Sequence, residues 1–163
     1  MFGQLHVRTA FPTTGGFDEQ VTVFCLHPVD ATSRAFARLL PQLADVRSIY
    51  APDLPGYGES DSSPARTLSD AAVAVSDLAR DLRLRQIDVI GLQYGAEVAV
   101  ELAVQKPELV RRLVVIGAPS LDRLSALKQQ RLVIDRPEAG GQPVDVMLEG
   151  FAKRIDTFLR GRS

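Results

Sequence analysis

The sequence has few of the residues that build metal centres, disulfide frameworks or histidine-dependent catalytic sites. Its 163 residues include no tryptophan, one cysteine and two histidines. Cys25 has no second cysteine to pair with, and His6 and His27 do not give the Cys/His spacing of a structural zinc site. We therefore expect no metal and no other cofactor, and we expect Cys25 to be a small apolar residue on a buried strand.

An excess of charge of either sign is also absent, as are long apolar runs. Lys and Arg number 19 and Asp and Glu number 20, so no surplus of positive charge is available to hold a phosphate backbone. No apolar run approaches the roughly 20 residues that span a bilayer, and the N-terminal "MFGQLHVRTAF" is not a basic stretch followed by an apolar one. These features predict a cytoplasmic protein with neither nucleic acid nor membrane as a partner.

The residues that are present predict one α/β domain over 1–163. Hydrophobic residues make up 45% of the chain, enough for a substantial core. Most of the apolar segments are continuous rather than alternating, which indicates strands of a mostly parallel sheet covered on both faces. The roughly six predicted strands are Leu5 to Ala10, Val21 to Leu26, Val46 to Tyr50, Ile87 to Leu92, Leu113 to Ile116 and Arg131 to Ile134.

Helical periodicity fills the intervals between these strands. A capping box of Thr67 and Asp70 opens an amphipathic helix that continues to Leu82. The segment from Ala96 to Val104 is apolar nearly all round and is expected to be the most buried helix. Two further helices are predicted, at Ser33 to Ala44, where Pro41 should kink or end the helix, and at Val146 to Leu159. The stretch from Asp135 to Pro143 is expected to be a loop.

Three segments in this order resemble the α/β-hydrolase family, in particular its esterase, lactonase and dehalogenase-like group. They are "FCLHPV" at 24–29, "APDLPGYGES" at 51–60 and "VIGLQYGAE" at 89–97. The first resembles the turn that supplies half of the family's oxyanion hole, the second its D-x-x-G-x-G-x-S loop, and the third its nucleophile elbow. The resemblance implies a three-layer sandwich around a mostly parallel sheet, as the periodicity also predicts.

The same resemblance marks where this chain departs from the family. The elbow pattern G-x-S-x-G has Gln93 in its middle position. The family's catalytic His would fall at or beside Gln142, and Asp122 is the only plausible survivor of the catalytic acid. Only Ser120 to Gln130 separates the last two predicted strands, so the cap domain and the acid-bearing strand are expected to be missing. Pro28 stands where the family has Gly.

Acyl transfer on this fold requires a nucleophile, a base and an acid that orients the base. The Gln93 amide has no ionisable proton to lose, and no His follows His27. His27 is expected to hold its turn by hydrogen bonds, and Asp122 to act as a helix N-cap. Ser60, Ser120 and Cys25 are nucleophiles by residue type only, since no base can be placed beside them. We therefore assign no catalytic residue.

A binding role is therefore the main functional hypothesis. The candidate ligand-binding residues are His27, Val29, Gln93 and Tyr94, and the backbone N–H groups of Val29 and Tyr94 form a possible anion-binding pair. Two versions stay open: a sensor or carrier of a small polar or carbonyl ligand, and a structural or regulatory subunit, which the truncation favours slightly. A homodimer across the edge at Arg131 to Ile134 or across the neighbouring helices is also expected.

Two other classes of function are alternatives to this hypothesis. One is a carboxylester hydrolase or lyase that uses water activated by an unrecognised group, or whose site is completed by a partner chain. The other is a nucleotide-binding α/β domain, which is disfavoured because the chain contains neither G-x-x-x-x-G-K nor G-x-G-x-x-G.

Overall fold

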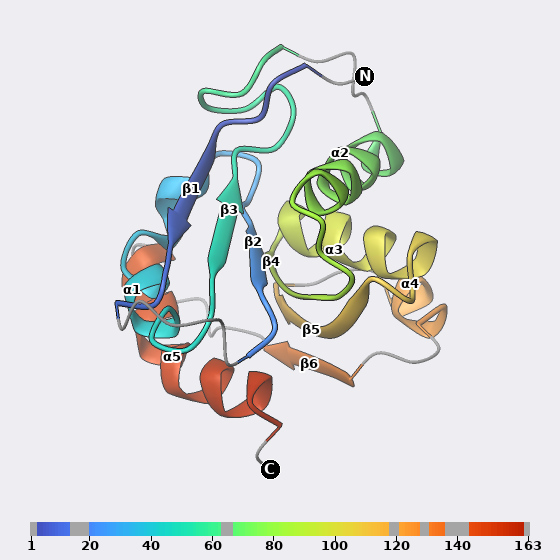
Figure 1. Ribbon diagram of the computed structural model, residues 1–163. Helices are drawn as coiled ribbons and strands as arrows, with labels where there is room; N and C mark the ends of the chain where they lie inside the picture. Colours follow the sequence, from blue (N-terminus) through green and yellow to red (C-terminus); the bar gives the residue numbers. More distant parts are fainter. Residues whose placement is uncertain are drawn as a thin grey trace.

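The fold is a six-stranded sheet between two layers of helices (Figure 1). The computed structural model describes residues 3–13, 20–62, 67–117, 121–127, 131–135 and 144–161. The strands are β1 (Val7–Ala10), β2 (Val23–Leu26), β3 (Ile49–Pro52), β4 (Ile87–Leu92), β5 (Val110–Ile116) and β6 (Arg131–Asp135). The helices are the 3₁₀ helix η1 (Ser33–Phe36), α1 (Leu39–Leu43), α2 (Leu68–Asp81), α3 (Tyr94–Gln105), α4 (Leu121–Ser125) and α5 (Val144–Leu159).

The sheet has the order β1-β3-β2-β4-β5-β6, and every neighbouring pair is parallel except β1 and β3. The predicted mostly parallel, six-stranded sheet is thus confirmed. Parallel strands align their carboxyl ends at one edge, where open α/β sheets place their ligand sites. The antiparallel β1 instead starts at this edge, with Val7 opposite Pro52 and Arg8 opposite Ala51.

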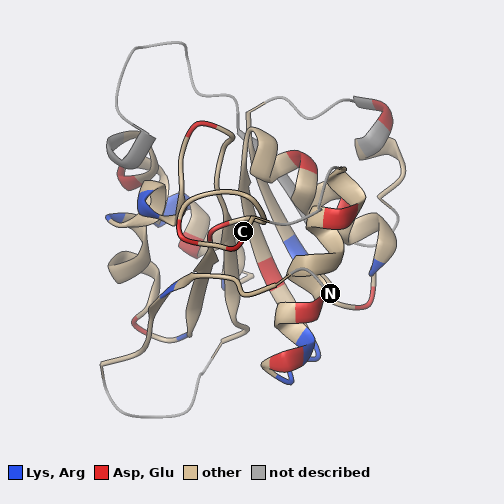
Figure 2. Ribbon diagram, turned by 90° about the horizontal axis from the view of Figure 1, so that it is seen from above, with Lys and Arg blue, Asp and Glu red and all other residues tan. Residues whose placement is uncertain are grey.

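Two hydrophobic cores lie on the two faces of the sheet. Successive residues of β2 point to opposite faces, as the period of two requires. Phe24 and Leu26 pack in the core beneath α2 and α3, whereas Val23 and Cys25 pack in the core beneath α1 and α5. Figure 2, which looks down on the molecule from above, shows the strands between these two helical layers. Both faces are covered, which accounts for the continuously apolar strands.

Helices α2 and α3 both agree with predictions made from local sequence patterns. The Thr67 hydroxyl accepts from the Asp70 N–H, and the Asp70 carboxylate accepts from the Thr67 N–H, both at 3.1 Å, so the capping box is present. Helix α3 buries seven of its twelve residues and α2 five of its fourteen. This difference agrees with the prediction that the helix after the elbow is the more deeply buried one.

The prediction for Ser33 to Ala44 was wrong in detail. The segment divides into η1 and α1, and the break falls at Ala37 and Arg38 rather than at Pro41. Pro41 is the third residue of α1, where a missing N–H costs nothing because the first turn has no intrahelical acceptor for it. Within the described residues no helix is both long and apolar enough to cross a membrane.

Candidate functional site

The elbow residue Gln93 lies between β4 and α3 at the carboxyl-end edge of the sheet. Its backbone has φ 50° and ψ −111°, a conformation that residues other than glycine rarely adopt. The Gln93 N–H donates to the Ile116 carbonyl at 2.7 Å, and the Gln93 carbonyl accepts from the Ala96 and Glu97 N–H groups. The sharp strand-to-helix turn is therefore intact, and Gln93 itself is exposed at its tip.

Two glycines make this turn possible. A Cβ on Gly95 would lie 2.0 Å from the Leu26 carbonyl oxygen, and one on Gly91 would lie 2.5 Å from the Gly95 carbonyl oxygen. Neither position has room for a side chain, because α3 begins directly against the ends of β2 and β4. This close approach of strand and helix explains the glycine spacing without any reference to catalysis.

His27 is buried in the turn after β2, and both of its ring nitrogens are engaged. Nε2 accepts from the Leu54 N–H at 2.8 Å, so the proton of the neutral ring is on Nδ1, which donates to the Pro28 carbonyl at 2.8 Å. Burial lowers the pKa of His27, although the Pro28 carbonyl and Asp53 oppose this effect. The expectation that His27 holds its turn by hydrogen bonds is confirmed, and neither ring nitrogen is free to accept a proton from a substrate.

The other predicted binding residues lie beside these two. Val29 is 47% exposed, and Tyr94 is half-buried. The Tyr57 ring packs between His27 and Tyr94, with centroid distances of 5.4 and 6.0 Å. Burial raises the pKa of Tyr94, and the neighbouring Tyr57 adds to the effect, so its phenol is neutral at physiological pH. Within the described residues, neither the Val29 nor the Tyr94 backbone N–H has a hydrogen-bond acceptor.

The loop after β3 is tied together through Asp53. Its carboxylate accepts from the Ser33 N–H at 2.7 Å, from the Glu59 N–H at 3.0 Å and from the His6 ring at 3.2 Å. Burial alone would raise the pKa of Asp53, but these hydrogen bonds, together with the neighbouring Ser33 hydroxyl, lower it below its usual value. Ser60 donates to the Asp53 carbonyl at 2.6 Å, so both residues hold this loop in place.

Among the described residues, neither Cys25 nor Asp122 has a side-chain hydrogen bond to a base, and the Ser60 Oγ accepts from the backbone N–H of His6 at 2.9 Å. Cys25 is completely buried, and burial raises the pKa of its thiol well above the usual range. The predicted N-cap role of Asp122 was wrong, because Asp122 lies within the first turn of α4, one residue beyond its start. Its side chain is exposed. Ser120 and Gln142 lie outside the described residues.

Sequence reasoning missed a second group of polar side chains, beside the loop of Asp53. The residues that come together there are His6, just before β1, Arg8 on β1, Ser33 on η1 and Glu59 in the loop itself. Only the antiparallel pairing of β1 with β3 brings Arg8 near this loop. The D-x-x-G-x-G-x-S pattern was the one signal in the sequence that pointed to this region, and it did not identify the partners.

Comparisons with known proteins agree with this geometry. The model of the alpha/beta hydrolase family matches residues 23–162. The chain is 30% identical over 138 residues to pimeloyl-(acyl-carrier protein) methyl ester esterase of Neisseria meningitidis serogroup B, covering 85% of this chain and 51% of that protein. It is 36% identical over 85 residues to 2-hydroxymuconate semialdehyde hydrolase of Pseudomonas sp. strain CF600, covering 49% of this chain and 29% of that protein.

Solved structures of hydrolases also share the fold of this chain. The epoxide hydrolase CorEH is similar with a TM-score of 0.63 and 26% identity, over 69% of this chain and 38% of that one. The N-acyl homoserine lactonase AidH has a TM-score of 0.64 at 24% identity, over 72% of this chain and 42% of that one, a likeness of fold. This chain spans about half or less of the length of these relatives. By its sheet order, its elbow and the match over residues 23–162, the chain belongs to the alpha/beta hydrolase family.

Proposed function

We propose that this chain acts by binding a small molecule with a carbonyl or carboxylate oxygen, and not by hydrolysing it. The observation that supports the proposal is Gln93 itself, an exposed carboxamide on an intact elbow backbone. An amide can donate and accept hydrogen bonds, but it has no proton to lose in forming a nucleophile. The chain has two histidines, His6 and His27. His27 is buried, and both of its ring nitrogens are hydrogen-bonded within the protein.

The ligand contacts follow from the groups around the elbow. The Val29 and Tyr94 N–H groups would donate to the ligand oxygen, as a pair of backbone donors does for an oxyanion. The Gln93 carboxamide would hydrogen-bond the adjacent polar atom, and the half-buried Tyr94 ring would pack against the apolar part of the ligand. The backbone N–H groups of Val29 and Tyr94 have no acceptor among the described residues. For this reason we prefer a sensor or carrier role over a purely structural one.

The alternative is that a longer or associated chain completes an esterase or lyase site. The named relatives, an esterase and a semialdehyde hydrolase, are hydrolases and support this alternative. Such a partner would have to supply both the base and the nucleophile, or a group that activates water.

Hydrolysis and binding are separated by one set of measurements. We expect no turnover of short-chain p-nitrophenyl esters and no labelling by a fluorophosphonate probe, in the chain as it stands and in Gln93→Ser. Serine without a base is not activated, so restoring it alone should change nothing. Labelling lost on substitution of a single Ser or Cys, or clear activity in Gln93→Ser, would contradict the proposal.

Binding is tested with methyl butyrate, a small ester that carries no charge. Its titration into the ¹⁵N-labelled chain should shift the amide resonances of Val29 and Tyr94 in a saturable way. Gln93→Ala should weaken this binding several-fold, whereas Gln105→Ala, on the far end of α3, should leave it unchanged. Equal shifts in the two variants would show that Gln93 does not contact the ligand.

A further inference from the structure

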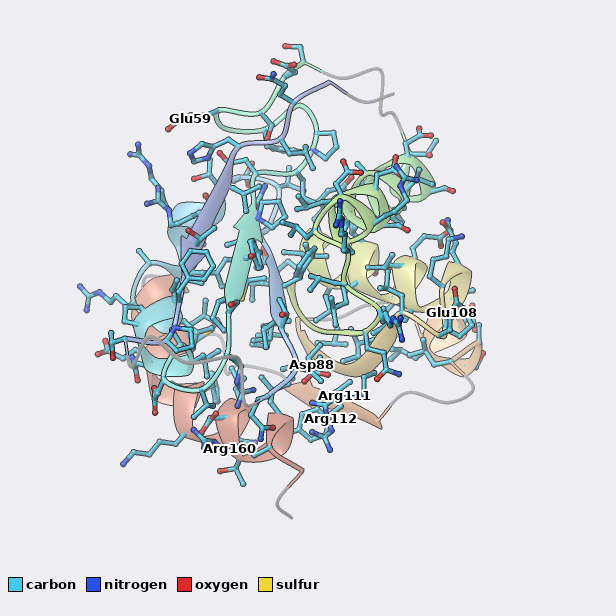
Figure 3. The ribbon with its side chains drawn as sticks, in the orientation of Figure 1. Glu59, Asp88, Glu108, Arg111, Arg112 and Arg160 are labelled. Atoms are coloured by element: carbon cyan, nitrogen blue, oxygen red, sulfur yellow. The ribbon has the colours of Figure 1, made fainter. Side chains whose placement is uncertain are left out.

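A second polar cleft opens at the carboxyl-end edge of the sheet, on the β1 side. It has a volume of about 190 Å³ and is lined by Arg8, Thr32, Ser33, Arg34, Asp53, Gly58 and Glu59. Figure 3 shows Glu59 at this edge, at the opposite end of the molecule from the labelled Asp88, Arg111 and Arg160. Since a water molecule takes up about 30 Å³ of liquid, the cleft has room for several waters or for one small organic ion.

Two hydrogen-bond donors in this cleft have no acceptor. Ser33 is fully buried, and its hydroxyl oxygen has no hydrogen-bond partner among the described residues. The Nε of Arg8 is likewise buried without a partner, and the Arg8 side chain forms no ion pair with any described residue. A buried donor left without a partner destabilises the protein, so a pair of them facing one cleft calls for an explanation.

The acidic groups in the cleft do not pair with Arg8. The Asp53 carboxylate accepts from the N–H groups of Ser33 and Glu59 and from the His6 ring, and it also lies next to the Ser33 hydroxyl, which lowers the pKa of Asp53 without meeting hydrogen-bond geometry. Glu59 is exposed and lies 3.7 Å from both Arg34 Nη2 and His6 Nε2. Neither carboxylate is paired with Arg8. The charge of Arg8 is therefore left without a counter-ion in the cleft, which Ser33 also lines.

We propose that this cleft binds a small oxyanion, a carboxylate or a phosphate, held by the Arg8 guanidinium and the Ser33 hydroxyl. A guanidinium presents several N–H groups in a plane and matches an oxyanion better than any neutral group does. Arg34 also lines the cleft, but its charge is paired with Glu59. Water in the cleft would satisfy the Ser33 hydroxyl but would leave the charge of Arg8 without a counter-ion.

The proposed anion site is separate from the elbow but is joined to it by the loop after β3. The residue before Gly58 in the chain is Tyr57, whose ring packs on His27 and Tyr94, so the two sides of one loop face the two sites. Gly58 has φ 56°, and a Cβ there would lie 2.2 Å from Asp53 Oδ2, so only glycine fits where the loop passes Asp53. The inference does not depend on the function proposed for Gln93.

The test is a titration of the ¹⁵N-labelled chain with sodium phosphate and, separately, with sodium acetate. Ionic strength is held constant with sodium chloride, which serves as the reference anion. We expect saturable shifts of the Ser33 and Gly58 amide resonances with at least one of the two oxyanions. Phosphate alone would indicate a phosphorylated ligand, acetate alone a carboxylate ligand, and both together a site that recognises their shared oxyanion chemistry.

Variants decide whether Arg8 and Ser33 hold the anion. Arg8→Gln should weaken binding at least tenfold and Ser33→Ala several-fold, because each removes a donor to the anion. Arg80→Gln, an exposed arginine on α2, should bind as the unchanged chain does, and so should Gln93→Ala. Arg8→Gln should unfold at the same temperature as the unchanged chain or higher, because it removes a donor that has no partner among the described residues.

Two results would overturn the proposal. One is that phosphate and acetate act no differently from chloride, which would leave water as the occupant. The other is that Arg8→Gln, or Ser33→Ala if the first variant does not fold, binds as tightly as the unchanged chain. If Gln93→Ala loses methyl butyrate binding but retains phosphate binding, the elbow site and the cleft bind their ligands independently.

Discussion

Gln93 is held in a strained backbone conformation by its neighbours and not by its own side chain. A residue at positive φ in such a turn costs on the order of 1–3 kcal/mol. The hydrogen bonds to Ile116, Ala96 and Glu97 involve only backbone atoms of Gln93, so any residue at this position would be placed in the same way. The elbow can therefore keep its shape when the nucleophile is replaced, and its shape is no evidence of catalysis.

His27 makes the stability of the chain depend on pH in a range where few other groups titrate. Its folded-state pKa is lowered, chiefly by burial, so the unfolded chain binds a proton that the folded chain does not. Stability is therefore fully present above the unfolded value of about 6.5 and falls as the pH drops below it. Between pH 7.5 and pH 5.5 we expect the free energy of unfolding to decrease by about 1 kcal/mol, measured by urea denaturation.

The matched variant is His27→Gln. It should be less stable than the unchanged chain at pH 7.5, because two hydrogen bonds are disturbed, but much of the pH dependence in this range should be gone. Asp53, whose folded-state pKa is lowered, loses its contribution only below about pH 4, outside the window. The same decrease in both proteins would assign the pH dependence to another group.

At the scale of elements, the C-terminal helix α5 is attached to the sheet by charged groups at the amino ends of the strands. Arg111 on β5 makes two hydrogen bonds to the fully buried Asp88 on β4, at 2.9 and 2.6 Å. Both Arg111 and Arg112 also donate to the Leu159 carbonyl at the end of α5. Figure 3 shows Asp88, Arg111, Arg112 and Arg160 gathered at this end of the molecule.

The Asp88 and Arg111 pair should behave as a buried ion pair in a double-mutant cycle. Arg111→Met should lower the free energy of unfolding by about 3–5 kcal/mol, because Asp88 is left charged and buried without its partner. Burial raises the pKa of Asp88, while the neighbouring arginines oppose this effect. The double variant Asp88→Asn/Arg111→Met should be more stable than Arg111→Met alone, in urea unfolding at pH 7.5. A double variant less stable than the single one would show that the charge of Asp88 is compensated without Arg111.

At the scale of the whole molecule, β6 ends the sheet, and within the described residues it pairs with β5 alone. The outer edge of a strand carries N–H and C=O groups that can pair with another chain. We propose that two copies of the chain associate about a two-fold axis at this edge or at the adjoining helices. Size-exclusion chromatography with light scattering should give a dimer at micromolar concentration. A monomer at the highest attainable concentration would contradict this expectation.

Several parts of the fold were predictable from the sequence because their causes are local. The capping box of Thr67 and Asp70 and the strand Ile87–Leu92 were placed correctly from residue spacing alone. The break between η1 and α1, at Ala37 and Arg38, was not predicted, because nothing in the local pattern marks a change from 3₁₀ to α hydrogen bonding. For the candidate site, the position of Gln93 followed from the glycine spacing, whereas the cleft at Arg8 and Ser33 was not foreseen.

The sequence by itself determined the family, the alternation of strands and helices, and the lack of a serine at the elbow and of any His after His27. These depend on which residues are present and on their spacing along the chain. Only the tertiary structure decided that His27 has both nitrogens engaged and that Arg8 and Ser33 face one cleft without acceptors. Such contacts join residues far apart in the chain, so they are set by strand order and register, which no local pattern encodes.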